Sequence, residues 1–410
     1  MTDDPAGAGR PVEADRLRIA FVYDALYPYA TGGAERRYHE IATRLAVRHE
    51  VHTVSWRYAE GTPASDPGAI THHAVGSPPA FYGADGRRTV REALNFAWRV
   101  VPHLLAHRYD VIDCSATPYV PVYGVWLAAR ATGTPLVVTW HEVWGAYWND
   151  YFEDRRAVAR MARAAERWTR PLGDVAVAVS SFTAARLDAL GHGPEVRVVP
   201  NGVSLAEIDA VPAAGTPTDV IFVGRLIADK KVDDLLRAIA LLRVAHPTVS
   251  CTIVGEGPER SSLETLARSL RLERNVNFTG RLDGGELTGR LKAARVLAMP
   301  SVREGYGLTV VEAMAAGAVP VVVRAPMSAA ADLVTDGVDG LVCDPGSVAL
   351  AESIFRLFHD EDARLRMARA AKASAQTSDW ASIAEGVELV YREAILTSHA
   401  LERTAHPSCT

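Results

Sequence analysis

The chain has 410 residues, of which 48% are hydrophobic and 23% are charged, a composition typical of a globular protein and a length that favours two domains. Its formal net charge of −5 excludes the basic surface of a general nucleic-acid-binding protein, so no nucleic-acid partner is expected. The four cysteines are scattered and form no Cys-x-x-Cys pair, which predicts free thiols in a reducing cytoplasm and no structural zinc.

The N-terminal segment does not resemble a targeting signal. Residues 1–16 are polar and rich in Pro, Gly and Ala, so we expect a flexible tail there. The most apolar long region, 119–140, contains Arg130 and is interrupted by prolines and a glycine, so it cannot be one spanning helix. The protein is expected either free in the cytoplasm or peripheral at the inner face of the membrane.

From Leu17 onward, short apolar runs alternate with longer amphipathic ones. The expected strands lie at 17–24, 50–56, 110–116, 135–141, 174–181 and 196–202. The helical patterns between them lie at 33–48, at 89–107, before Thr132, at 153–170 and after Phe182. Strands that are apolar throughout and alternate with helices predict a parallel sheet covered on both faces. Residues 17–203 are therefore expected to form a Rossmann-like domain.

The alternation stops once and then begins again. A stretch rich in Ala, Pro, Gly and Thr predicts a linker over 204–219. Strands and helices alternate again through 220–379, the second expected Rossmann-like domain, and an amphipathic run at 380–396 precedes an expected flexible tail at 397–410. The predicted fold class is α/β, with two doubly wound parallel-sheet domains facing across a cleft. Their strand ends place a ligand in that cleft.

The segment 299–323, MPSVREGYGLTVVEAMAAGAVPVVV, combines a strand end, a glycine-containing loop and a helix. The glycines let the backbone approach a ligand, and the first helical turn offers unpaired N–H groups at the positive end of the helix dipole. Such a corner suits a diphosphate, while its two glutamates can accept hydrogen bonds from sugar hydroxyls. The candidate donor-binding residues here are Glu304, Gly305, Tyr306, Gly307, Leu308, Thr309 and Glu312.

EGYGLTVVEAMAAGAVPVV resembles the signature of the retaining glycosyltransferases of sequence family four, which use nucleotide-activated sugars on a GT-B fold. In that family the first Glu of the pair contacts the donor sugar and the second contacts the ribose. The resemblance therefore implies these roles for Glu304 and Glu312. It covers nearly all of 17–396 in the order of elements and is strongest in 221–232 and 299–323. It implies that 17–203 is the acceptor-side domain, that 220–379 binds the nucleotide-sugar, and that the helix 380–396 returns to the first domain. After Val323 this chain departs from the family's Gly-rich loop.

A pair of basic residues follows the first strand of the second half. Gly224 and Arg225 end that strand, and Lys230 follows at the start of the next helix. A guanidinium fork and an ammonium group can together neutralise a departing diphosphate. The resemblance implies this role for Arg225 and Lys230. Lys231 is the alternative candidate for the role of Lys230, because the Lys-Gly pair usual in the family is Lys-Lys in this chain.

The resemblance implies three further contacts to the donor. They are Gly255 near the donor pocket, Arg281 and Leu282 beside the base, and Gly32 and Gly33 facing the diphosphate from the opposite domain. For each of these residues, the alternative to a donor contact is a purely structural role. Glycines equally serve tight turns and helix starts, and an arginine after a strand is often an exposed turn residue.

His141 ends the strand 135–141 and is therefore expected to point toward the cleft. The resemblance matches it to a histidine beside the donor sugar, so we expect it to bind the sugar and not to act as the nucleophile; a satisfied structural histidine is the alternative. Trp144, Tyr147 and Trp148 have helical spacing, which indicates a packed helix face, but aromatic faces also stack on sugar or cyclitol rings. They are the acceptor-binding candidates. The arginines of 155–170 form either an exposed basic helix or a contact for anionic lipid.

No Asp-x-Asp motif follows a strand and no His/Cys cluster has metal-ligand spacing, so neither a metal nor a cofactor is expected. We predict a glycosyltransferase that moves a sugar from a nucleotide diphosphate, first of all a UDP-sugar, to a hydroxyl-bearing acceptor. The resemblance implies retention of configuration. The expected catalytic residues are His141, Glu304, Arg225 and Lys230.

Several alternatives stay open. The acceptor is either a small natural product or cyclitol, or a glycan or lipid-linked intermediate. A GT-B epimerase acting on a UDP-sugar and a non-catalytic nucleotide-sugar-binding module are the competing functions. The oligomeric state is not predicted.

Overall fold

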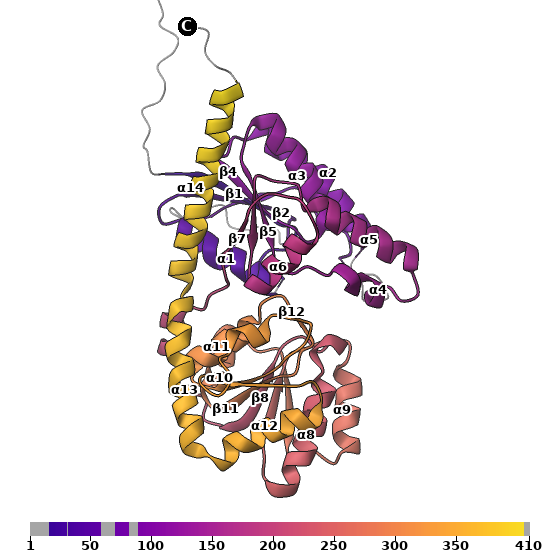
Figure 1. Cartoon of the computed structure of the whole chain (residues 1–410), viewed down its shortest axis with the longest axis vertical. Coiled ribbons are helices and arrows are strands. Elements are labelled where there is room, and N and C mark those ends of the chain that lie inside the picture. The colour runs from indigo at the N-terminus through magenta and orange to yellow at the C-terminus, as the bar shows by residue number, and fades with distance from the viewer. Residues whose placement is uncertain (1–15, 31, 59–69, 82–88, 406–410) are drawn as a thin grey trace, which may run out of the picture.

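The computed structural model describes residues 16–30, 32–58, 70–81 and 89–405 and arranges them in two α/β domains (Figure 1). Each domain is built on an all-parallel sheet. The N-terminal sheet has the strand order β3-β2-β1-β4-β5-β6-β7, and the C-terminal sheet has the order β10-β9-β8-β11-β13-β15. These orders confirm the predicted pair of doubly wound domains.

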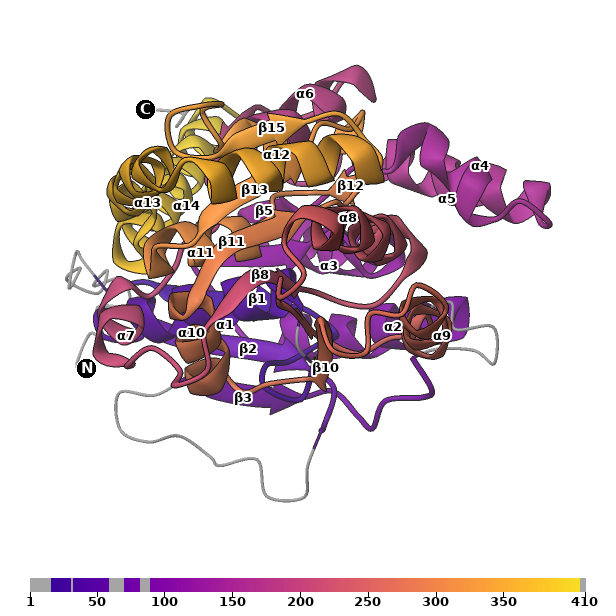
Figure 2. The ribbon, with the colours of Figure 1, turned by 90° about the horizontal axis from the view of Figure 1, so that it is seen from below.

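Apolar runs supply the strands of the N-terminal sheet, and amphipathic segments supply its helices. The strands are β1 (Arg18–Val22), β2 (Glu50–Ser55), β3 (Thr71–Ala74), β4 (Val111–Ser115), β5 (Leu136–Trp140), β6 (Val175–Ala178) and β7 (Val196–Val198). The helices are α1 (Gly33–Leu45), α2 (Val90–Ala106), α3 (Tyr119–Thr132), the 3-10 turn η1 (Gly145–Tyr147), α4 (Trp148–Tyr151), α5 (Arg156–Thr169) and α6 (Ser181–Ala189). In both Figure 1 and Figure 2, α4 and α5 project as an arm from this domain.

The sequence pattern did not predict β3. This edge strand reads THHA, and its residues are half-buried or exposed, so it lacks the continuous apolar character of the central strands. It pairs in register with β2, from His52 opposite Thr71 to Ser55 opposite Ala74. An edge strand is paired on one side only, so its sequence is less constrained by burial.

The C-terminal domain repeats the alternation. Its strands are β8 (Thr218–Val223), β9 (Cys251–Val254), β10 (Val276–Gly280), β11 (Ala294–Met299), β13 (Val319–Val323) and β15 (Leu341–Cys343), and β12 (Arg303–Glu304) and β14 (Met327–Ser328) form a separate small pair. Its helices are η2 (Ala228–Lys230), α8 (Val232–Ala245), α9 (Arg260–Ser269), α10 (Gly284–Lys292), α11 (Leu308–Ala316), η3 (Ala330–Leu333), α12 (Ser347–His359), α13 (Glu361–Ala375) and η4 (Gln376–Ser378).

Each sheet is covered on both faces. Along β8, Val220 and Phe222 join one apolar cluster, whereas Ile221 joins the cluster on the opposite face. Successive residues of a strand point to opposite faces, so a strand buried on both sides must be apolar at every position. This is why the continuous apolar runs in the sequence predicted the sheets correctly.

The last helix, α14 (Trp380–Ala405), leaves the C-terminal domain and lies along α1 of the N-terminal domain (Figure 1). Its buried Trp380 and Tyr391 belong to the apolar cluster on one face of the N-terminal sheet. Tyr391 donates a hydrogen bond of 2.6 Å from its hydroxyl to Oδ2 of Asp113 on β4. The returning helix is therefore an integral part of the first domain, as the sequence predicted.

The chain crosses between the domains twice, and the two crossings lie side by side. Val203 forms a parallel bridge with Asp379, and its N–H donates to the carbonyl of Ser378 at 2.7 Å. A Cβ on Gly202 would lie 2.8 Å from that same carbonyl, so this close approach requires glycine. Both crossings therefore meet at one hinge.

The structure adds detail to the expected boundaries. The expected linker at 204–219 contains α7 (Leu205–Ala210) and the first residues of β8. The expected tail at 397–410 is helical through Ala405, since α14 continues beyond 396, and its last five residues lie outside the described residues. The expected tail at 1–16 also lies outside them, apart from Arg16.

Candidate active site

The loop and helix predicted from residues 299–323 are present at the domain boundary. Helix α11 begins after Gly307, whose φ of 106° is the left-handed conformation that favours glycine, and ends before Gly317, whose φ is 90°. The amides of Leu308 and Thr309 open the helix and have no intrahelical carbonyl to bind. The expected anion-binding helix terminus is therefore in place.

Lys230 and Glu304 form an ion pair between Nζ and Oε1. Their side chains are 17% and 13% exposed, so water screens the pair only partly. The neighbouring Lys231 has a φ of 50° at the N-terminus of α8. This is the left-handed position that glycine fills most easily, which explains a Lys-Gly preference at this point. The contact with Glu304 distinguishes Lys230 from Lys231.

Glu312, one turn into α11, lies against the first domain. Its carboxylate forms an ion pair with the guanidinium of Arg36, which belongs to α1. Burial raises the pKa of Glu312, and Arg36 acts against that rise. The side chain of Arg36 is 30% exposed and that of Glu312 only 9%, so the arginine is the partner that can reach solvent. Both glutamates of the motif thus lie beside a cation.

The glycine after Glu304 makes the closest backbone contact between the domains. A Cβ on Gly305 would lie 1.9 Å from the carbonyl oxygen of His141. The carbonyl of Gly305 accepts hydrogen bonds from the hydroxyls of Ser180, at 2.9 Å, and Thr183, at 3.1 Å. Gly305 therefore permits the close approach of the other domain, and its contact with a donor stays a prediction.

His141 lies at the end of β5, as its position in the sequence predicted. Its ring packs edge-on against Tyr38, with the centroids 5.8 Å apart. Burial lowers the pKa of His141 to about 3, with a smaller contribution from Arg37, so the imidazole is neutral at pH 7. Its Nε2 is buried and finds no hydrogen-bond partner among the described residues. An unpaired buried polar atom is costly, which makes this nitrogen a candidate ligand contact.

Tyr306 does not offer its side chain to a ligand. It is 7% exposed, and its hydroxyl donates a hydrogen bond of 2.9 Å to the carbonyl of Asn201 near the hinge. The side chain therefore joins the loop to the interdomain crossing, and the donor contact expected of Tyr306 stays a prediction that its backbone would have to fulfil. Only its backbone lies in the Glu304 loop.

The remaining donor candidates of the second domain have different positions. Arg225 and Arg281 are exposed, and neither side chain forms a hydrogen bond or ion pair with the described residues. Leu282 packs on an apolar cluster of the second domain. A Cβ on Gly255 would lie 1.8 Å from the carbonyl of Gly224, so these glycines let the ends of two strands meet. Both glycines therefore allow close strand packing, Leu282 is only partly buried, and the donor contacts expected of these residues stay predictions.

The glycine pair of the first domain stands at the start of α1. Gly32 is the residue before the helix and has an extended φ of −131°, while Gly33 is the first helical residue. Both are exposed, and a Cβ on Gly33 would meet no atom within 4 Å. Three residues later, Arg36 reaches Glu312. The pair therefore lies on the element that faces α11.

The aromatic segment after β5 is not one packed helix face. Trp144 stacks on Trp148 with their centroids 4.3 Å apart, and Trp148 also packs against the core of its own domain. Tyr147 instead reaches the second domain, where its hydroxyl donates to Oδ1 of Asp229 at 2.7 Å. Trp144 and Tyr147 lie over the guanidinium of Arg303. These contacts give the aromatic segment an interdomain packing role, and its binding of an acceptor stays a prediction.

Several residues at the site were not singled out from the sequence. Arg36, Glu142, Asp229 and Arg303 each contribute to ion pairs that cross the domain boundary or lie beside it. No motif marks them. The available signal was adjacency, because Asp229 precedes Lys230 and Arg303 precedes Glu304, yet adjacency alone does not show which way a side chain points.

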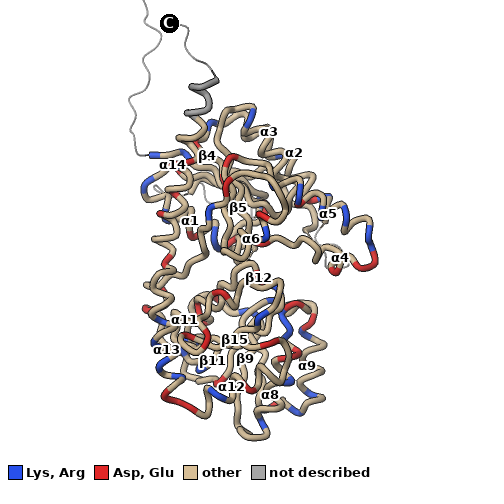
Figure 3. The backbone as a smooth tube through the Cα atoms, in the orientation of Figure 1, with Lys and Arg blue, Asp and Glu red and all other residues tan. Residues whose placement is uncertain are grey.

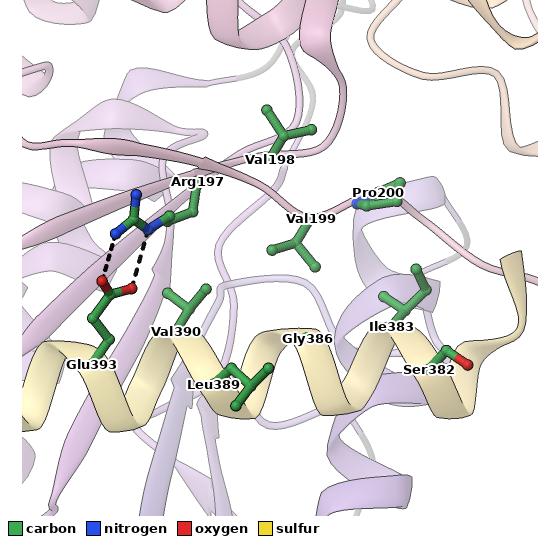
Figure 4. Close-up of a pocket in the computed structure, with 10 residues that line it drawn as sticks. All are labelled: Arg197, Val198, Val199, Pro200, Ser382, Ile383, Gly386, Leu389, Val390 and Glu393. Atoms are coloured by element: carbon green, nitrogen blue, oxygen red, sulfur yellow. Dashed lines mark hydrogen bonds and ion pairs between the residues drawn. The ribbon is translucent and has the colours of Figure 1, made fainter. Parts of the chain in front are cut away.

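Another hollow lies away from this site. The groove between β7 and α14 has a volume of ≈ 370 Å³, is mostly apolar, and is crossed at one end by the Arg197–Glu393 ion pair (Figure 4).

Within the described ranges, no group of three or more His, Cys, Asp or Glu side chains is placed to hold a metal ion. None of the helices in the described part of the chain has the length and apolarity needed to cross a bilayer.

Comparison with known families agrees with this geometry. Residues 205–374 match the family model described as Glycosyl transferases group 1, and residues 31–207 match the one described as Glycosyltransferase Family 4. The class that the fold and the site define is that of the glycosyltransferases.

The relatives extend this match to nearly the whole chain. The glycogen synthase of Mycobacterium tuberculosis is 30% identical over 401 residues, which cover 92% of this chain and 94% of the relative. A D-inositol 3-phosphate glycosyltransferase of Streptomyces avermitilis is 28% identical over 90% of this chain and 84% of the relative. The chain therefore belongs to glycosyltransferase family 4, and it is an enzyme of the transferase class.

Solved structures show the same architecture. The sucrose-phosphate synthase of Thermosynechococcus elongatus superposes with a TM-score of 0.78 at 19% identity, covering 93% of this chain and 100% of that one. Anabaena HepE in complex with UDP-glucose superposes with a TM-score of 0.73 at 20% identity, covering 92% and 100%. These likenesses show that the two domains form the GT-B fold.

Proposed function

We propose that this glycosyltransferase transfers a sugar from a UDP-sugar to a hydroxyl-bearing acceptor, with retention of configuration and without a metal ion. The observation that carries the proposal is the meeting of two elements at the domain boundary. The end of β5 brings the buried, unpaired Nε2 of His141 to the loop that holds Glu304, where Lys230 adds a positive charge. A nucleotide-sugar donor offers its sugar hydroxyls to His141 and Glu304 and its diphosphate to Lys230.

The reaction creates negative charge on the departing diphosphate. As the bond from the sugar's anomeric carbon to the β-phosphate oxygen breaks, Lys230 and the N-terminus of α11 stabilise that charge. The acceptor oxygen bonds to the same carbon on the face that the diphosphate leaves, and its proton passes to a β-phosphate oxygen. No covalent intermediate is needed, and configuration is retained.

The positioning of the donor follows from the same residues. Because His141 is neutral at pH 7, its imidazole does not act as a cation. It can instead donate a hydrogen bond to a sugar hydroxyl or accept one from it. Glu312 is placed to accept from a ribose once Arg36, its more exposed partner, turns toward the diphosphate. Arg225 is exposed beside the end of β8 and can add a guanidinium fork.

The choice of UDP rests on a structural neighbour, because Anabaena HepE was solved with UDP-glucose. The acceptor is proposed at the level of class. The names of the relatives indicate a glucan in one case and an inositol phosphate in the other. Both a glycan or lipid-linked intermediate and a small cyclitol or natural product therefore belong in the test.

A mass-spectrometric screen tests the proposal. UDP-, GDP- and ADP-sugars are each incubated with a glycan, a cyclitol set and a lipid-linked acceptor, with and without EDTA. The expected result is a glycosylated acceptor and free UDP in both conditions, with the anomeric configuration of the donor preserved by NMR. An altered sugar nucleotide formed from donor alone would instead show an epimerase, and tight donor binding without any product would show a binding module.

We also propose a cytoplasmic location with peripheral contact to the inner face of the membrane. Helix α5 carries arginines along its length (Figure 3), and its Met161 and Trp168 are 73% and 67% exposed. An arginine-rich helix with exposed apolar side chains suits an anionic lipid surface. Sedimentation with phosphatidylglycerol vesicles, compared with phosphatidylcholine vesicles, tests this contact; equal binding to both would reject it.

A further inference from the structure

A charged and aromatic cluster spans the domain boundary beside the candidate active site. Arg303 donates from Nη1 to Oε2 of Glu142 at 2.6 Å and from Nε to Oδ2 of Asp229 at 2.9 Å. Its guanidinium carbon lies 4.5 Å from the ring centroid of Trp144 and 5.0 Å from that of Tyr147. Tyr147 closes the cluster by donating to Asp229 at 2.7 Å. We name these five residues the Arg303 clasp.

Each domain fixes its own half of the clasp. In the first domain, the fully buried carboxylate of Glu166 accepts the N–H groups of Trp144 and Gly145, both at 2.7 Å. In the second domain, the N–H of Val302 donates to the carbonyl of Asp229 at 2.9 Å. The two halves are therefore held by local contacts, and the clasp forms where they meet.

The clasp is covalently adjacent to both charged residues of the site. Arg303 and Glu304 are the two residues of β12, and Asp229 directly precedes Lys230 in η2. Side chains of successive strand residues point in opposite directions. Accordingly Arg303 faces the first domain while Glu304 turns to Lys230. A shift of Arg303 would therefore move Glu304, and a shift of Asp229 would move Lys230.

The electrostatics favour arginine at this position. The side chains of Arg303, Asp229 and Glu142 are 15%, 19% and 27% exposed, so the pairs are mostly shielded from water. Burial acts to lower the pKa of Arg303, but the two carboxylates outweigh it and raise that pKa. A planar guanidinium can bind two carboxylates and lie against two rings at once, which an ammonium group cannot do.

We propose that Arg303 is a positioning residue, which holds Glu304 and Lys230 in their reactive arrangement by binding Glu142, Trp144 and Tyr147 of the opposite domain. This inference rests on the proposed transfer function. Arg303 acts through its neighbours and does not itself contact the donor. Transfer should therefore depend on a contact made by residues that bind neither the nucleotide nor the sugar.

Substitution of Arg303, with Arg295 as a matched control, tests this role. Arg295 also binds two carboxylates, those of Asp219 and Glu361, and lies 5.1 Å from the ring centroid of Phe358, but all of these belong to one domain. With the donor and acceptor found in the screen, Arg303→Met should lower kcat by about ten- to a hundredfold, because small displacements of reacting groups have effects of that order. Arg295→Met should change kcat by less than about twofold.

Two further measurements separate positioning from folding. Arg303→Lys should recover only a small part of kcat, and the dissociation constant for UDP, measured by calorimetry, should change less than kcat in every Arg303 variant. In a double-mutant cycle, Tyr147→Phe should lose most of its effect on kcat when Arg303 is already Met. X-ray scattering should give a larger radius of gyration for Arg303→Met than for Arg295→Met.

Equal kcat values for Arg303→Met and Arg295→Met, or independent effects of Arg303→Met and Tyr147→Phe, would overturn the proposal. A wild-type enzyme that forms no product with any donor would overturn the proposed function instead. In that case the scattering measurement is the remaining test of whether the Arg303 clasp holds the two domains together, and an unchanged radius of gyration in Arg303→Met would reject it.

Discussion

Replacing Lys230 by alanine removes the ammonium group that lies against the Glu304 carboxylate. If this group stabilises the departing diphosphate, kcat should fall by about 10² to 10³, the size found when one preorganised donor to a developing negative charge is removed, or about 2.7 to 4 kcal/mol in the barrier. The shielded surroundings support the upper part of that range, because the side chains of the pair are only 17% and 13% exposed and water replaces the lost charge poorly.

The same substitution should also destabilise the fold, and this effect can be separated. Alone, Lys230→Ala leaves a mostly buried carboxylate without its cation, which costs up to about 3 kcal/mol. Combining it with Glu304→Gln removes that carboxylate charge. We expect the thermal midpoint to recover in the double variant while kcat stays low, since the diphosphate still lacks its ammonium partner and the donor sugar has also lost the Glu304 carboxylate.

The adjacent lysine is the matched control. Lys231 has a φ of 50°, so Lys231→Gly should relieve about 1 kcal/mol of backbone strain and raise the thermal midpoint. Its kcat should stay within about twofold of wild type. Initial rates of UDP release and differential scanning fluorimetry supply both quantities. A near-normal kcat for Lys230→Ala together with a large loss for Lys231→Gly would refute the assignment of the charge to Lys230.

Three further outcomes are expected. Gly305→Ala places a methyl group where only 1.9 Å separates it from the carbonyl of His141, so kcat should drop at least about tenfold with both domains folded; a wild-type rate would show that the domains need not meet there. Tyr391→Phe removes the 2.6 Å hydrogen bond to the buried Asp113 carboxylate and should lower the free energy of unfolding in urea by about 1.5 to 3 kcal/mol, a loss that an unchanged midpoint would disprove. Burial, helped by a neighbouring histidine, lowers the pKa of His73 to about 4, so its contribution to stability is complete above pH 6.5 and is lost as the pH falls toward 4; the thermal midpoint should drop less over that interval in His73→Gln than in wild type.

Local patterns predicted the fold and the centre of the site. The continuous apolar runs became parallel strands, and the segment 299–323 formed the strand, loop and helix expected of it, with Gly307 and Gly317 at the two ends of α11. Helix caps, strand burial and left-handed turns depend on residues within a few positions of one another. A single sequence therefore contains enough information to place Glu304 and Glu312 at one corner.

The aromatic segment shows where a local pattern misleads. The spacing of Trp144, Tyr147 and Trp148 indicated a packed helix face. In the structure, however, Trp144 precedes a 3-10 turn, Tyr147 ends that turn, and Trp148 begins a four-residue helix. Their side chains pack against the guanidinium of Arg303 as well as against one another. Spacing can state which side chains share a face, but not which surface that face meets.

The amino-acid sequence by itself thus determined two doubly wound domains, the helix terminus beside Glu304 and the position of His141 at a strand end, since each follows from short-range periodicity and backbone preference. Only the tertiary structure decided which charges meet. Arg36 pairs with Glu312 across 276 positions, and Arg303 pairs with Glu142 across 161. Such pairs depend on how the surfaces of two domains face each other, and the free energy of that arrangement is spread over the whole interface, so no stretch of sequence encodes it alone.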